Sequence, residues 1–134
     1  MDKTFEQMIC NRFFSKRYND RLYYELSSKK RNEFFNKMSH TADIYLGNCV
    51  SDSFRMPPDK EEIVKYLEDD KCYFITKFNE FDGQICNLSD TLEVLWCNGM
   101  PYMIVNKKCD KAYLETEYDF SEHKSFFLIW NVKK

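Results

Sequence analysis

Glycine and proline are scarce in this chain of 134 residues, with three of each. Gly-rich phosphate-binding loops and long flexible linkers need many more of these residues, so the sequence argues against both. Apolar runs are also short. The longest, residues 126–130, suits a single strand, whereas a helix that crosses a bilayer needs about 20 apolar residues. We therefore predict one compact domain, residues 1–134, that does not enter a membrane.

The N-terminus lacks the basic and continuously apolar segments of a signal peptide, because Asp2, Lys3 and Glu6 interrupt its apolar residues. Without such a signal, we expect a cytoplasmic protein whose six cysteines are free thiols, most of them buried. The cysteines show no C-x-x-C spacing, and the chain has only two histidines. A closely spaced zinc site is therefore not predicted, and no cofactor is expected.

Helical periodicity dominates the first half of the chain. Apolar residues recur at three- and four-residue steps over residues 4–18, which predicts an amphipathic helix with a basic polar side. A longer helix is predicted over residues 27–46, where a glycine follows as a stop signal. Residues 49–58 are expected to be irregular. Two short helices are predicted further on, over residues 59–70 and 89–98.

Strand signals dominate the second half. Residues 72–78 are rich in aromatic and β-branched side chains, which predicts a strand. Residues 102–105, 111–120 and 125–132 have similar character and are separated by turn-like segments, which predicts an antiparallel meander. The predicted fold class is α+β, with N-terminal helices packed on a mostly antiparallel sheet of four to five strands.

Charge is unevenly distributed along the chain. Residues 1–50 carry nine Lys/Arg against six Asp/Glu, whereas residues 51–134 carry eleven against sixteen. The basic first part raises nucleic-acid binding through the N-terminal helices as one alternative function. Acidic residues alternate with these basic ones, and the isoelectric point of the chain is about 5.7. Nucleic acid is therefore not the expected partner.

The most informative pattern is a row of alternating acidic residues in the predicted strand 111–120. Alternate strand residues project from one face, so three carboxylates and an aromatic ring should lie together on the surface. Such a row suits an electrostatic binding surface with an aromatic anchor. Charges that protect an edge strand from aggregation explain it equally well. The candidate partner-binding residues are this row and two weaker acidic additions: Tyr113, Glu115, Glu117, Asp119, Glu80 and Asp82.

Catalysis is the other alternative. His40 or His123 could activate a cysteine thiol, but no local signature joins either of them to a nucleophile. A small enzyme or ligand-binding domain would instead place histidine, cysteine or tyrosine side chains in a polar pocket between the helices and the sheet. The acidic clusters lack the spacing of a calcium loop. We predict no catalytic residue and no metal ligand.

Several segments resemble the immunity proteins that bacteria encode beside polymorphic toxins, including those of contact-dependent growth inhibition. The resemblance rests on residues 22–31 (LYYELSSKKR), which lead into an aromatic helix, on Asp-Gly at residues 82–83 and on Gly-Met-Pro at residues 99–101. It implies a protein that is not an enzyme and that neutralises a cognate toxin, expected to be a nuclease with a basic cleft. Ordered carboxylates would imitate the phosphates that such a cleft binds. The sequence leaves the toxin and the oligomeric state open.

Overall fold

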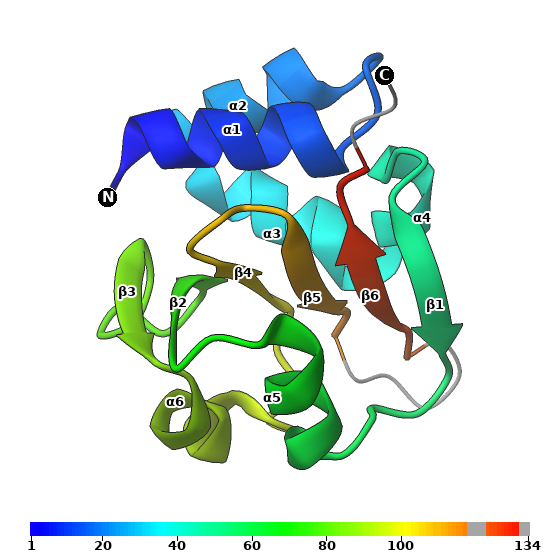
Figure 1. The fold of residues 1–134 in the computed structure, drawn as a ribbon. Helices are drawn as coiled ribbons and strands as arrows, with labels where there is room; N and C mark the ends of the chain where they lie inside the picture. The colour runs from blue at the N-terminus through cyan, green and yellow to red at the C-terminus, as the bar shows by residue number, and fades with distance from the viewer. Residues whose placement is uncertain (118–122, 132–134) are drawn as a thin grey trace.

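The computed structural model describes residues 1–117 and 123–131, in which a six-stranded sheet lies between two layers of helices (Figure 1). The strands are β1 (Val50–Phe54), β2 (Lys71–Thr76), β3 (Gln84–Asn87), β4 (Tyr102–Asn106), β5 (Lys111–Glu115) and β6 (Ser125–Ile129). Their order across the sheet is β1-β6-β5-β4-β2-β3, and each neighbouring pair is antiparallel. The predicted α+β class is confirmed, and the sheet has six strands where four to five were predicted.

The helices form one layer on each face of the sheet (Figure 1). The first layer consists of α1 (Lys3–Phe13), α2 (Asn19–Ser27), α3 (Arg31–His40) and α4 (Ala42–Tyr45), and the second of α5 (Lys60–Leu67) and α6 (Leu88–Leu95). Alternate residues of a strand point to opposite faces. In β2, Tyr73 and Ile75 therefore join the core under the first layer, while Cys72 and Phe74 join the core under the second.

Strand β6 shows why an unbroken apolar run belongs inside the sheet. Residues 125–128 are all buried, with Phe126 and Leu128 in the core of the first layer and Phe127 in that of the second. A strand covered on both faces has no exposed side on which polar residues would alternate. Within the apolar run 126–130, residues 126–128 are thus covered on both faces, whereas Ile129 is exposed.

Three predicted boundaries are wrong for identifiable reasons. The predicted helix 27–46 is interrupted at Thr41, whose hydroxyl donates to Lys37 O at 2.9 Å, an arrangement that weakens and bends helices. Strand β1 forms within the segment expected to be irregular. Its central residues, 51–53, are exposed and polar, so the strand shows no apolar alternation and forms through backbone pairing with β6, while Phe54 at its end packs against Phe127. Strand β5 ends at Glu115, and residues 118–120 of the predicted strand lie outside the described residues.

Helix α6 begins directly after β3, and Asn87 caps it. The Asn87 side-chain oxygen accepts a hydrogen bond from the backbone N–H of Asp90 at 2.9 Å. The predicted start of this helix, residue 89, lies one residue after the observed start at Leu88. We expect Asn87→Ala to lower the free energy of unfolding by about 1 kcal/mol, because an N–H at the helix start loses its acceptor.

Urea denaturation at neutral pH measures this effect. Asn87→Asp is the matched control, since its carboxylate accepts the same hydrogen bond and should preserve stability. Equal stability of the alanine variant and the unaltered protein would show that this cap contributes nothing.

Candidate protein-binding surface

Tyr113 and Glu115 project from β5 toward the layer formed by α5 and α6, and both are buried. The Tyr113 hydroxyl donates to Glu115 Oε1 at 2.6 Å, and the hydroxyl of Tyr102 on β4 donates to the same oxygen at 3.2 Å. Burial raises the pKa of Glu115 to about 7, although both hydrogen bonds favour the ionised form. The expectation that Tyr113 and Glu115 are exposed is therefore wrong, because β5 lies inside the sheet and helices cover it.

The buried polar cluster around Glu115 extends to β6. Tyr113 Oη lies 3.2 Å from Ser125 Oγ, which lies 3.0 Å from His123 Nε2. Burial lowers the pKa of His123, which favours the neutral imidazole. Ser125 is completely buried. The hydrogen bonds of this cluster therefore connect three adjacent strands beneath the second helical layer.

Glu117, the next acidic member of the predicted row, does not share a surface with Glu115. Glu117 contacts α3 in the first helical layer, where its carboxylate lies 3.2 Å from His40 Nε2 and its backbone N–H donates to Ser39 O. Asp119 lies outside the described residues. Glu80 is exposed in the segment between β2 and β3. The predicted row is thus not a single binding face.

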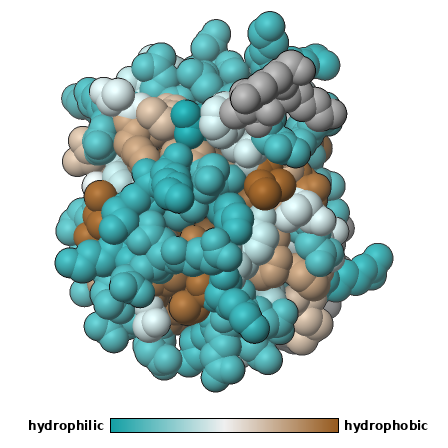
Figure 2. Space-filling model, in the orientation of Figure 1, coloured by the Kyte–Doolittle hydropathy of each residue, from teal (hydrophilic) through white to brown (hydrophobic). Residues whose placement is uncertain are grey.

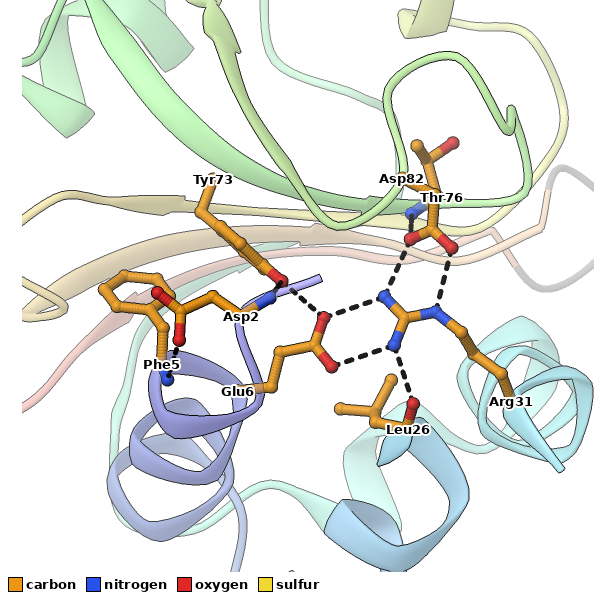
Figure 3. Close-up of polar contacts among 8 residues, drawn as sticks. All are labelled: Asp2, Phe5, Glu6, Leu26, Arg31, Tyr73, Thr76 and Asp82. Atoms are coloured by element: carbon orange, nitrogen blue, oxygen red, sulfur yellow. Dashed lines mark hydrogen bonds and ion pairs between the residues drawn. The ribbon is translucent and has the colours of Figure 1, made fainter. Parts of the chain in front are cut away.

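Asp82 belongs to an ion-pair network centred on Arg31 (Figure 3). The Arg31 guanidinium donates to both carboxylate oxygens of Asp82 and to both of Glu6, with all four distances 2.8 Å. Its fifth N–H donates to Leu26 O, so all five donors are used. The hydroxyl of Tyr73 also donates to the fully buried Glu6, at 2.6 Å. This network joins α1, α3 and the turn before β3, so Asp82 is neutralised within the chain.

The chain concentrates negative charge in the segment that contains the second helical layer. Residues 59–93 carry ten Asp/Glu against four Lys/Arg, whereas residues 1–40 carry five against nine. Four of the ten carboxylates form ion pairs: Glu68, Asp69, Asp82 and Glu93. The other six are exposed and form no ion pair among the described residues: Asp59, Glu61, Glu62, Asp70, Glu80 and Asp90. The segment that contains α5 and α6 is therefore acidic, and the segment that contains α1, α2 and α3 is basic.

A cavity of about 540 Å³ opens between α5 and α6. Val64 from α5 and Leu92 from α6 form its apolar wall, and Glu61 and Glu93 are among its charged lining residues. Figure 2 shows a small hydrophobic patch in the lower part of the view, where these helices lie in Figure 1, surrounded by hydrophilic residues. We call helices α5 and α6, with Asp59 and this cavity, the acidic layer.

The cysteines are free thiols, as predicted, and four of the six are buried. Burial raises the pKa of Cys49 and of Cys109 to about 11, and that of Cys72 to about 12, so these thiols are protonated near neutral pH. Within residues 1–117 and 123–131, no group of three or more His, Cys, Asp or Glu side chains is arranged to hold a metal ion. The helices in the same ranges are all too short or too polar to span a membrane.

Comparison of the chain with protein-family models, with curated proteins and with solved structures found no match.

Proposed function

We propose that this protein is an immunity or inhibitor protein that binds a cognate toxin, a nuclease with a basic cleft, and blocks its active site without being an enzyme itself. The acidic layer supports this proposal, because four of its exposed carboxylates form no ion pair among the described residues: Asp59, Glu61, Glu62 and Asp90. The proposed binding face therefore differs from the strand row that the sequence suggested. It lies on the opposite side of the sheet from α1–α4, whose connecting segments carry the basic residues Lys16, Arg17, Lys29 and Lys30.

The electrostatics of the acidic layer suit a competitor of phosphate. Exposed carboxylates remain ionised and hydrated at neutral pH, and their summed potential attracts a cationic cleft over a distance of about 8–10 Å at physiological salt. Complementary charge speeds the encounter and fixes the orientation of the bound partner. The acidic layer and nucleic acid are both negatively charged and repel each other. The acidic layer would therefore not bind the nucleic-acid substrate but would compete with it for the cleft of the toxin.

The expected result for Glu61→Lys combined with Glu62→Lys is at least about a tenfold loss of affinity for the toxin domain, since each change replaces attraction with repulsion. The salt dependence of binding should also become weaker. Calorimetry at two salt concentrations, with the toxic C-terminal domain encoded beside the gene, measures both quantities. Protection of cells that express this domain should be lost in parallel.

Asp20→Lys combined with Asp52→Lys provides the matched control. Both residues are exposed and lie outside the acidic layer, on α2 and β1, and the change in net charge is identical. This control should bind and protect like the unaltered protein. A neighbouring toxin domain against which the unaltered chain gives no protection would overturn the proposed function. Equal binding by the two double variants would show that the acidic layer is not the interface.

A further inference from the structure

We propose that Cys72 and Cys86 are a modification site, at which an oxidant of the low-molecular-weight disulfide class converts the two thiols into a disulfide between strands β2 and β3. Both thiols are free in the structure. This site is independent of the proposed function, because it involves only two adjacent strands of the chain.

The register of the β2–β3 hairpin places the two cysteines directly opposite each other. Cys72 pairs with Cys86 in this antiparallel ladder, and among the described strand pairs no other cysteine faces a cysteine. A hydrogen bond from Leu88 N–H to Asp70 O, at 2.8 Å, fixes the register beside the pair. Opposite residues in such a ladder have Cα atoms about 4.5 or 5.5 Å apart, and a disulfide requires about 4.4–6.8 Å. The backbone therefore holds the two residues at a separation that a disulfide can bridge.

Both side chains lie on the face of the sheet that α5 and α6 cover. Cys72 is completely buried in the core of the second layer, and Cys86 packs against the same core. Cys72 Sγ lies 4.0 Å from Asp69 O, a weak contact that costs little to break when the side chain rotates toward Cys86. Three of the other four cysteines belong to the core on the opposite face of the sheet: Cys10, Cys49 and Cys109. Cys72 is therefore the thiol that Cys86 faces.

The two thiols differ in exposure, which gives each a distinct role. Cys86 lies on the edge strand β3 and is partly exposed, so a dissolved oxidant reaches it first. Its thiolate attacks one sulfur of the small disulfide and expels a small thiolate, which leaves a mixed disulfide on Cys86. The Cys72 thiolate then attacks the sulfur of Cys86 and expels the second small thiolate. Two electrons and two protons thus pass from the protein thiols to the small disulfide, which becomes two thiols.

Burial sets the rate of this reaction. It raises the pKa of both thiols, that of Cys72 to about 12. Only a thiolate attacks a disulfide, so the reaction should be slow at neutral pH and should accelerate by about tenfold for each unit of pH below the pKa of the attacking thiol. The finished link closes the loop of residues 72–86. It fastens the edge strand, and the start of α6 that follows it directly, to β2.

Peptide mapping after oxidation tests the proposed pair. The unaltered protein is incubated with excess oxidised glutathione at about pH 8.5, where more of each thiol is ionised, and the remaining thiols are then alkylated. Digestion without reductant should give a linked peptide that contains residues 72 and 86. The exposed Cys97 should carry glutathione and shows that the oxidant reacts. A mixed disulfide that persists on Cys86 without the link, or a link from Cys86 to another cysteine, would overturn the proposal.

Three variants separate the roles of the two thiols, and circular dichroism reports whether each is folded. Cys72→Ala removes the second thiol and should trap glutathione on Cys86. Cys86→Ser removes the accessible thiol at a partly exposed position and should leave the buried Cys72 reduced. Cys97→Ser is the matched control, because it removes an exposed cysteine outside the ladder, and the link should form unchanged. Oxidation of Cys72 in folded Cys86→Ser, or no trapped glutathione in folded Cys72→Ala, would contradict the proposed pair.

Discussion

Arg31→Met should lower the free energy of unfolding by about 3–5 kcal/mol, the usual cost of removing one partner from a buried ion pair. The arginine is only 12% exposed and holds Glu6, whose side chain is completely buried. Without the guanidinium, Glu6 would keep only its hydrogen bond from Tyr73 and would be a buried charge without a cation. Urea denaturation at pH 7, with the slope of the transition checked for each variant, measures the loss.

A double-mutant cycle identifies the cause of this loss. Glu6→Gln added to Arg31→Met should recover part of the stability, because an amide is less costly to bury than a carboxylate without a cation. Arg31→Lys should not restore the network, since one ammonium group cannot form two bidentate pairs. The exposed Arg55→Met serves as the control and should change stability by less than about 0.5 kcal/mol. A loss below 1 kcal/mol for Arg31→Met would show that Glu6 finds another partner.

Glu115→Gln should stabilise the protein at pH 8 and have a progressively smaller benefit as the pH falls toward 5. Burial raises the pKa of Glu115 from 4.5 to about 7 in the folded state, so the folded protein holds this proton more tightly than the unfolded chain. The contribution of Glu115 to stability is thus fully present below pH 4.5. It declines as the pH rises to about 7, by about 3 kcal/mol in all.

The difference in unfolding free energy between Glu115→Gln and the unaltered protein, measured at pH 5, 6, 7 and 8, isolates this group. His123 is present in both proteins, so its own titration is largely removed by taking the difference. Glu80→Gln, at an exposed carboxylate, is the control and should give a difference that is flat and near zero. If the difference in unfolding free energy for Glu115→Gln is also independent of pH, folding does not raise the pKa of this buried carboxyl.

Sequence periodicity correctly predicted which side chains of β5 share a face. It did not predict whether helices cover that face. Alternation along β5 correctly placed Tyr113 and Glu115 on the same side of the strand. Whether that side faces water depends on the sheet order and on α5 and α6, which are set by contacts between distant parts of the chain. The exposed polar residues 51–53 at the centre of β1 give no alternation of apolar and polar residues, so the sequence did not predict this strand.

The ion-pair network shows a signal that sequence reasoning missed. Glu6 shares one face of α1 with Ile9, Cys10 and Phe13, at the three- and four-residue spacing of a buried stripe. A charged residue within an apolar stripe must find a partner inside the protein. Its partner Arg31 lies 25 residues away in sequence, so only the fold could identify it. The acidic second half of the chain was recognised, but Glu115 on β5 is buried, and four exposed carboxylates without an ion pair among the described residues lie on or beside α5 and α6.

Residues 1–40, which build most of the first helical layer, carry four more Lys/Arg than Asp/Glu, whereas Asp59, α5 and α6 together carry three more Asp/Glu than Lys/Arg, so charge is separated across the sheet despite a net charge of only −2. In the field of a positively charged surface, such a molecule experiences a torque before any contact is made. The molecule would turn its α5–α6 side toward that surface and its α1–α3 side away from it. Fewer collisions would then occur in unproductive orientations.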